Sequence, residues 1–197
     1  MSTAKIVGVI GETGSGKSTF SNYIQKNYAA YVINADQIGH LVLDENQIKE
    51  ALVKKFSENI LVDSRINRKR LGSIVFNDAS ALEFLSQLTH PRIRERIIEE
   101  IQEKKNTYSL ILIDGVALVE ANIHTLCDLV IYIFTSREIR LKRLVEQRNI
   151  PYERAVAMMA SQKETDFYDH YSDVTLSLNH GIEHKEQEIK HLLQEIL

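Results

Sequence analysis

The chain has few of the residues that cross-link or stiffen a protein. Its 197 residues include one cysteine, Cys127, two prolines and no tryptophan. A single cysteine excludes an internal disulfide, as is usual for proteins of a reducing compartment. No apolar run reaches the roughly 18 residues of a membrane span, and "MSTAKIVGVIG" lacks the longer apolar stretch of a signal peptide. We therefore expect a cytoplasmic protein without a membrane partner.

The chain also lacks an excess of charge of either sign. Lysine and arginine number 24 against 27 acidic residues, which leaves a formal net charge of −3. Nucleic-acid-binding chains usually carry a basic excess, so we expect no nucleic-acid partner. Because no Pro/Gly/Ser-rich linker or internal repeat occurs, residues 1–197 are expected to form one domain, as a monomer or weak homo-oligomer.

Long apolar runs are absent, but five short ones occur. β-branched residues dominate these runs and turn residues bound them, which is typical of buried strands: 5–11, 30–35, 109–115, 129–135 and 174–178. Runs that are apolar on both faces favour a parallel sheet covered by helices, and helical patterns occur at 17–27 and 183–197. The prediction is an α/β fold of the P-loop kinase type, with a five-stranded parallel sheet flanked by helices.

Two segments between the expected strands are longer than a crossover needs. Residues 37–108 contain helix patterns such as "IKEALVKKF" and no convincing strand, so they predict an inserted helical subdomain. Residues 137–170 are rich in Arg, Gln and Glu and predict a second helical excursion. We interpret this second segment as a lid, whose closure would exclude water from a site.

Glycine is scarce, yet three of the eight glycines lie within residues 11–16. "GETGSGKS" matches G-x-x-x-x-G-K-[ST] between an expected strand and an expected helix, the context of a phosphate-binding P-loop. In such a loop Lys17 reaches the β- and γ-phosphates, and the Ser18 hydroxyl ligates Mg²⁺. The alternative is a glycine-rich turn without a ligand. We expect Mg·ATP to bind here, through Gly11, Thr13, Gly14, Ser15, Gly16, Lys17, Ser18 and Thr19.

A carboxylate follows the third expected strand. "LILIDG" places Asp114 at the strand end, where an acidic residue can hold Mg²⁺ directly or through water. The alternative is a carboxylate that caps the turn between strand and loop. Asp114 and Ser18 are therefore the predicted metal-binding residues.

A second carboxylate follows the second expected strand, which ends "VINADQIGH". Strand alternation would put Asn34 and Asp36 on one face, with Asp36 at the last step of the strand, where parallel sheets place their sites. There Asp36 could take a proton from an acceptor hydroxyl. The alternative is an N-cap of the following helix.

Several further sequence blocks follow the P-loop in a characteristic order and spacing. They are "INADQIGH", "INRKRLGSIVFNDASALEFLSQLTHPRIR", "LILIDGVALVE", "DLVIYIFTSREIRLKRL" and "YSDVTLSLNHG". With the P-loop, they resemble the dephospho-CoA kinase family nearly from end to end. The resemblance implies a kinase that transfers phosphate from Mg·ATP to the ribose 3′-hydroxyl of dephospho-CoA, the last step of coenzyme A biosynthesis, with Asp36 as the catalytic carboxylate.

The same resemblance implies roles for other residues. Arg68 and His90 would contact the acceptor, and Asn179 and Gly181 would form the loop against the adenine of ATP. From the residues alone, Arg68 could also lie on a solvated helix face, His90 could be packed at a helix boundary, and residues 179–181 could be a simple turn.

An arginine of the lid would steady the transferring phosphate. The resemblance assigns this role to Arg143, since a planar, permanently charged fork suits a phosphoryl group. Arg140 and Arg148 are alternates, although each is more typical of a surface charge.

The chain departs from the family pattern at several positions. Asn34, Asn67 and Met158 stand for expected charged residues, Val116, Ala117 and Val119 alter the block after the third strand, and Arg148 comes one position later than expected. Two alternatives therefore stay open. One is a kinase of another nucleoside-like or nucleotide-like molecule, and the other is a nucleotide-binding switch without transfer activity.

Two other clusters have residue types that occur in binding sites. His180 and His184 have the spacing of two metal ligands, but no third ligand accompanies them, so we expect no zinc site. Phe167, Tyr168 and Tyr171 are expected to pack where the lid returns to the sheet, with an adenine contact as the alternative.

Overall fold

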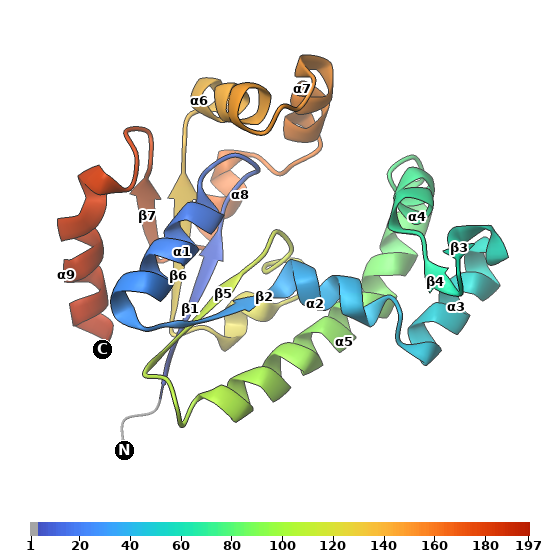
Figure 1. The fold of residues 1–197 in the computed structure, drawn as a ribbon, viewed down its shortest axis with the longest axis horizontal. Coiled ribbons are helices and arrows are strands. Elements are labelled where there is room, and N and C mark those ends of the chain that lie inside the picture. Colours follow the sequence, from blue (N-terminus) through green and yellow to red (C-terminus); the bar gives the residue numbers. More distant parts are fainter. Residues whose placement is uncertain (1–3) are drawn as a thin grey trace.

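A parallel five-stranded sheet forms the centre of the molecule (Figure 1). The computed structural model describes residues 4–197. The strands of the sheet are β1 (Lys5–Ile10), β2 (Tyr31–Asn34), β5 (Leu110–Asp114), β6 (Leu129–Phe134) and β7 (Val174–Ser177). Their order is β2-β5-β1-β6-β7, and every neighbouring pair runs parallel. The predicted α/β class and all five predicted strands are confirmed.

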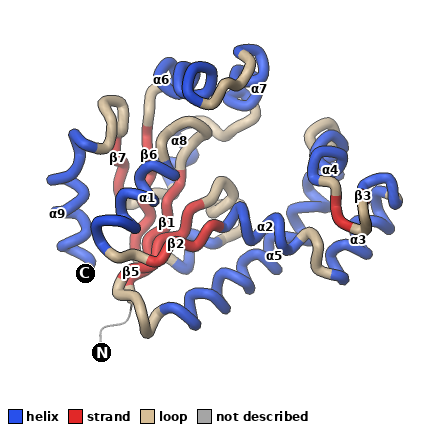
Figure 2. Tube along the Cα trace, in the orientation of Figure 1, coloured by secondary structure: helices blue, strands red, loops and turns tan. Residues whose placement is uncertain are grey.

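Helices surround the sheet and fill the two long insertions (Figure 2). The α-helices are α1 (Lys17–Tyr28), α2 (Ala35–Val42), α3 (Asn46–Phe56), α4 (Arg68–Val75), α5 (Ala79–Lys104), α6 (Arg137–Lys142), α7 (Tyr152–Ala160), α8 (Thr165–His170) and α9 (Glu186–Ile196). Short 3₁₀ turns lie at Glu58–Ile60, Ile123–Leu126 and Glu183–Lys185.

Strand alternation divides the core between the two faces of the sheet. Leu110 and Leu112 of β5 pack with α1 and α9, whereas Ile111 and Ile113 pack with α2, α5 and α8. All four side chains are fully buried. Because β5 is apolar at each of these four positions, both of its faces are covered by helices, as a central parallel strand requires.

The insertion between β2 and β5 is mostly helical, but it also contains a small hairpin. β3 (Leu61–Val62) pairs antiparallel with β4 (Arg65–Ile66) across a two-residue turn. Asp63 and Ser64 both have positive φ, at 48° and 62°, which is the conformation of a type I′ turn. The expectation of no strand in 37–108 was therefore wrong, because two-residue strands are too short to show an alternating pattern.

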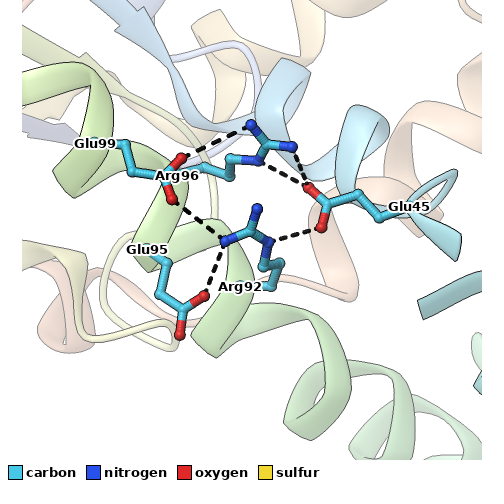
Figure 3. Close-up of polar contacts among 5 residues, drawn as sticks. All are labelled: Glu45, Arg92, Glu95, Arg96 and Glu99. Carbon is cyan, nitrogen blue, oxygen red and sulfur yellow. Dashed lines mark hydrogen bonds and ion pairs between the residues drawn. The ribbon is translucent and has the colours of Figure 1, made fainter. Parts of the chain in front are cut away.

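An ion-pair cluster joins the start of this insertion to the long helix α5 (Figure 3). Glu45, just before α3, accepts hydrogen bonds from Arg92 Nε at 2.7 Å and Arg96 Nε at 2.8 Å. Arg92 also contacts Glu95 and Glu99. The cluster thus ties α3, which lies toward the outer end of the molecule, to a helix that also covers the sheet (Figure 1).

The second insertion, between β6 and β7, forms the segment above the carboxyl ends of the strands (Figure 1). It consists of α6, a π-helical turn (Arg143–Gln147), α7 and α8. We call residues 137–170 the lid segment. Within residues 4–197, no helix combines the length and apolar character needed to cross a membrane.

Candidate active site

The phosphate loop, residues 11–18, leaves the end of β1 and opens α1. Gly11, Gly14 and Gly16 all have positive φ, which side-chain-bearing residues rarely adopt. A Cβ on Gly11 would lie 2.6 Å from the backbone oxygen of Ile133, so space as well as conformation requires glycine there. The loop therefore turns its backbone N–H groups and the start of α1 toward one pocket, the arrangement that binds phosphate.

Lys17 lies at this turn as the first residue of α1. Its ammonium donates hydrogen bonds to the backbone oxygens of Gly11 at 2.7 Å and Glu12 at 3.3 Å. Burial lowers the pKa of Lys17, and the negative charges of Asp114 and Asp36 oppose that shift. The two carboxylates therefore favour the charged lysine that an anion site needs.

Asp114 ends β5 beside α1. One of its oxygens accepts a hydrogen bond from the Ser21 hydroxyl at 3.0 Å. Burial raises the pKa of the Asp114 carboxyl, while the Ser21 hydrogen bond and the Lys17 charge act in the opposite direction. Ser18 is exposed at the start of α1, so a hydroxyl and a carboxylate oxygen border the same pocket.

These oxygen donors fit Mg²⁺ better than a softer metal. Mg²⁺ in phosphate sites takes one or two protein oxygens and completes its shell with water and phosphate oxygens. Among residues 4–197 there is no group of three or more His, Cys, Asp or Glu side chains that could hold a metal alone, and this includes the neighbourhood of His180 and His184. Ser18 and Asp114 would therefore bind Mg²⁺ only when the phosphate oxygens of a nucleotide supply further ligands.

Asp36 lies on a helix and not on a strand. β2 ends at Asn34, whose side chain accepts a hydrogen bond from Gln37 N–H at 2.8 Å and so caps α2. Asp36 stands in the first turn of α2, and its Oδ1 accepts a hydrogen bond from Val116 N–H at 3.0 Å. The expected strand-end position of Asp36 was wrong, because Asn34 caps a helix that already begins at Ala35.

A pocket of about 140 Å³ lies over the phosphate loop, and we call it the loop pocket. It is lined by Glu12, Thr13, Gly14, Gly16, Lys17, Ser18, Asn34, Asp36, Asp114, Val116 and Arg148. Four expected site residues, Lys17, Ser18, Asp36 and Asp114, thus border one space.

A second hollow of about 380 Å³, which we call the α2–α5 cleft, adjoins Asp36 on the other side. Its walls are mainly apolar and come from α2, α5 and the segment after β5: Ala35, Asp36, Gly39, His40, Leu43, Leu85, Thr89, Ile93, Ala117, Ala121 and Ile123. Asp36 borders both this cleft and the loop pocket. The cleft is therefore the natural place for a molecule that reacts at the phosphate loop.

Arg68 and His90 do not line this cleft. Arg68 is exposed at the start of α4, and His90 lies half-buried on α5, where it borders a separate shallow hollow with Glu120. Burial lowers the pKa of His90, partly offset by a hydrogen bond to the backbone of Glu120 and by the charge of that residue. Both belong to the inserted helices, but neither is brought next to Asp36.

The lid arginines have three different surroundings. Arg143 donates hydrogen bonds to the backbone oxygens of Gly14 at 3.2 Å, Ser15 at 3.0 Å and Leu178 at 2.7 Å. Its guanidinium therefore ties the phosphate loop to the segment after β7. Arg148 is exposed at the end of the π-helical turn and borders the loop pocket.

Arg140 is buried, although the sequence favoured a surface position. Its side chain is 10% exposed and pairs with Glu12, with 3.4 Å between Arg140 Nη2 and Glu12 Oε1. Sequence reasoning missed Glu12 altogether, since the P-loop pattern accepts any residue at that position. It also missed Gln162, which accepts a hydrogen bond from Thr13 N–H at 2.9 Å and donates one to the Thr13 hydroxyl at 3.0 Å.

A further hollow of about 250 Å³ shares Gly14, Gly16 and Arg148 with the loop pocket, and we call it the α6–β7 pocket because the segments that follow α6 and β7 line it. It is lined by Gly14, Gly16, Thr19, Arg143, Gln147, Arg148, Leu178, Gly181, Ile182 and Glu183. Asn179 stands beside it, and its side chain accepts a hydrogen bond from Ser136 N–H at 2.8 Å. Gly181 has a φ of 94°, so the turn after β7 depends on glycine.

Two residues of the aromatic cluster before β7, Tyr168 and Phe167, pack in or against the core, while Tyr171 is 37% exposed. Tyr168 is buried and stacks on Tyr132 of β6, with 5.5 Å between the ring centroids. Phe167 and Tyr171 contact each other at 5.1 Å beside it. The cluster connects the returning end of the lid segment to the sheet.

Comparisons with known proteins show the family to which the chain is similar. A family model described as dephospho-CoA kinase matches residues 5–184. The chain is 31% identical over 193 residues to the dephospho-CoA kinase of Lactobacillus johnsonii, covering 96% of this chain and 97% of that protein. It is 30% identical over 188 residues to that of Listeria monocytogenes, with 94% of each chain covered. A solved structure of dephospho-CoA kinase from Campylobacter jejuni has 32% sequence identity and a TM-score of 0.70, covering 97% of this chain and 96% of that one.

Proposed function

This chain belongs to the dephospho-CoA kinase family, and on that premise we propose how its residues carry out the reaction. The protein is an ATP-dependent kinase that phosphorylates dephospho-CoA in the final step of coenzyme A biosynthesis. The observation that carries the residue assignment is the position of Asp36. Its carboxylate borders both the loop pocket and the α2–α5 cleft.

ATP would place its phosphates on the phosphate loop and its adenosine end in the α6–β7 pocket. The backbone N–H groups of residues 11–19 would surround the phosphates, and Lys17 would neutralise the β- and γ-phosphates. Asn179 and Gly181 shape the turn beside the α6–β7 pocket, which supports a role for them next to the adenine. Ser18 and Asp114 would hold Mg²⁺, which when bound lowers the negative charge of the triphosphate.

Dephospho-CoA would lie in the α2–α5 cleft with its ribose 3′-hydroxyl next to Asp36. The carboxylate would accept the hydroxyl proton while the hydroxyl oxygen forms a bond to the γ-phosphorus. The bond between that phosphorus and the β–γ bridging oxygen breaks, and ADP leaves with the bridging oxygen. The Val116 N–H, bonded to Oδ1, would keep the carboxylate oriented during this transfer.

We propose different roles for the two lid arginines that lie at the phosphate loop. Arg148 borders the loop pocket, so we assign it the stabilisation of the transferring phosphate. Arg143 keeps its hydrogen bonds to the loop oxygens and would act by holding the loop in shape. Arg68 and His90 lie on the inserted helices outside the cleft, and a role at the acceptor would be at its outer rim.

The direct test is incubation of the purified protein with Mg·ATP and dephospho-CoA, followed by mass spectrometry for one added phosphate. A panel of other nucleosides and nucleotides, read through ADP release, separates this activity from a different acceptor. If the protein binds ATP but transfers phosphate to no acceptor, this result would contradict the kinase activity and favour a nucleotide-binding switch. The near balance of acidic and basic residues supports a protein that works without nucleic acid. We further propose that it works in the cytoplasm, as a monomer or weak homo-oligomer.

A further inference from the structure

A buried carboxylate lies directly beneath the phosphate loop. Glu12 follows the first glycine of the loop, and only 3% of its side chain is exposed. Its Oε2 accepts a hydrogen bond from the Tyr132 hydroxyl at 2.9 Å, and its Oε1 lies 3.4 Å from Arg140 Nη2. A negative charge in a loop that binds a polyanion is unfavourable unless a positive charge neutralises it.

The neutralising arginine comes from the lid segment, 128 residues later in the chain. Arg140 is the fourth residue of α6, and its main chain packs on the loop itself. A Cβ added to Gly14 would lie 3.1 Å from the backbone oxygen of Arg140 and 3.3 Å from its Cβ. Among residues 4–197, Arg140 Nε is buried without a hydrogen-bond partner, so the guanidinium is held mainly by the Glu12 charge.

The same carboxylate is connected to the other end of the lid segment. Tyr132, which donates to Glu12, is fully buried on β6 and stacks on Tyr168 of α8, with an interplanar angle of 18°. The outgoing helix α6 therefore contacts Glu12 directly through Arg140, and the returning helix α8 is connected to it through Tyr132. The exposed helix α7 lies between them along the chain.

We propose that Glu12 and Arg140 are positioning residues that latch both ends of the lid segment to the phosphate loop. The pair keeps the Glu12 charge from opposing ATP and holds the arginine-bearing lid above the loop. The inference rests on the ATP site proposed above. It assigns a function to two residues that the phosphate-loop pattern leaves free.

The proposed role of this ion pair predicts how the affinity for Mg·ATP should differ among variants of Glu12 and Arg140. Arg140→Met leaves Glu12 buried and unpaired beside the phosphates, so the Kd for Mg·ATP should rise roughly tenfold, together with loss of transfer. Glu12→Gln still accepts the Tyr132 hydrogen bond and should lower kcat by about 3- to 30-fold, because the lid segment is then held less firmly on the loop, with a smaller change in ATP affinity. In Glu12→Gln/Arg140→Met no charge is left unpaired, so ATP affinity should return toward that of the wild type.

The experiment measures Mg·ATP binding by calorimetry and transfer to dephospho-CoA for the wild type, both single variants and the double variant. Arg154→Met, which changes an exposed arginine of α7, is the matched control and should behave as the wild type. Acceptor-independent ATP hydrolysis provides a further readout. A lid that no longer closes properly should raise hydrolysis relative to transfer, because water then competes with the acceptor.

Rescue of ATP affinity in the double variant, with a raised ratio of hydrolysis to transfer in Glu12→Gln, supports the latch. Affinity losses that simply multiply in the double variant, or variants that lose thermal stability alone, overturn it. If Arg140→Met fails to fold, the comparison of Glu12→Gln with the double variant decides, since the latch predicts similar ATP affinity for both. Calorimetry needs no acceptor, so a wild type that binds Mg·ATP but does not phosphorylate dephospho-CoA would contradict only the acceptor assignment.

Discussion

The carboxylate of Asp36 accepts a hydrogen bond from the backbone N–H of Val116 at 3.0 Å, which joins the first turn of α2 to the segment after β5. The approach is close, because a Cβ on the adjacent Gly115 would lie 2.8 Å from the Cβ of Ala35. One oxygen of Asp36 is thus fixed by the main chain. The carboxylate has a defined direction at the border of two pockets before any substrate binds.

Asp36→Asn should lower kcat by roughly 10²- to 10⁴-fold, the usual cost of removing a general base. Asparagine can still accept the Val116 hydrogen bond, so the fold and the KM for ATP should change little. Asn34→Asp is the matched control, since aspartate caps a helix as well as asparagine does and kcat should stay within about threefold. Steady-state kinetics with saturating dephospho-CoA provide the comparison, and an Asp36→Asn enzyme of near wild-type kcat would exclude Asp36 as the base.

Lys17→Ala should reduce transfer by at least about 10²-fold, because one preorganised positive charge on the phosphates is lost. The circular dichroism spectrum should be unchanged, since the side chain contacts loop oxygens and not the apolar core. Lys26→Ala removes an exposed lysine from the same helix and should leave activity intact. Near wild-type turnover in Lys17→Ala would show that the loop does not bind the phosphates as proposed.

Arg148→Gln and Arg143→Gln should separate catalysis from scaffolding. Arg148 is exposed, so its loss should lower kcat by roughly 10- to 10³-fold with an unchanged Tm. Arg143→Gln removes hydrogen bonds to three backbone oxygens and should cost about 2–3 kcal/mol of stability as well as activity. Measuring the Tm and kcat of each variant distinguishes the catalytic role from the structural role. Equal Tm losses in both variants would contradict the division of roles.

Glu45→Gln should weaken the attachment of α3 to α5 (Figure 3). Although burial opposes it, hydrogen bonds from Arg92 and Arg96 keep the pKa of Glu45 below its ordinary value. A lowered carboxyl pKa contributes stability that is present above the unfolded-state pKa and is lost as pH falls through the folded-state pKa. The variant should therefore melt at a lower temperature than the wild type at neutral pH, and the difference should shrink as the pH falls through the folded-state pKa of Glu45 and also in high salt. Thermal melts at several pH values check this, and a difference in Tm that does not depend on pH would argue against this role.

Asp114→Asn should stabilise the metal-free protein while abolishing transfer. Burial raises the pKa of this carboxyl, so the folded protein binds the proton more tightly than the unfolded chain, and the charged form opposes folding above that pKa. The neutral amide removes this opposition. Thermal melts in EDTA should show a higher Tm for the variant at pH 8, with a gain that decreases as the pH falls. A lower Tm at pH 8 would mean that the Asp114 charge is needed for folding.

Local patterns in the sequence determined much of this protein. The glycine spacing of residues 11–16 specifies a phosphate loop because positive φ is a property of single residues, and the three loop glycines adopt it. The five apolar runs specify strands because β-branched residues suit a sheet that is covered on both faces. The resemblance of the later blocks was sufficient for the family.

Only the tertiary structure decided where the charged residues act. Arg140, Arg143 and Arg148 lie within nine residues and look alike in the sequence. One pairs with a buried carboxylate, one binds loop oxygens and one borders the loop pocket. The face that a helix buries depends on partners more than a hundred residues away, and no local pattern contains them. The position of Asp36 could not be predicted from the local sequence either. Strand alternation favours Asp36 at the end of a strand, whereas the Asn34 cap favours it in a helix, and the packing of α2 on α5 decides for the helix.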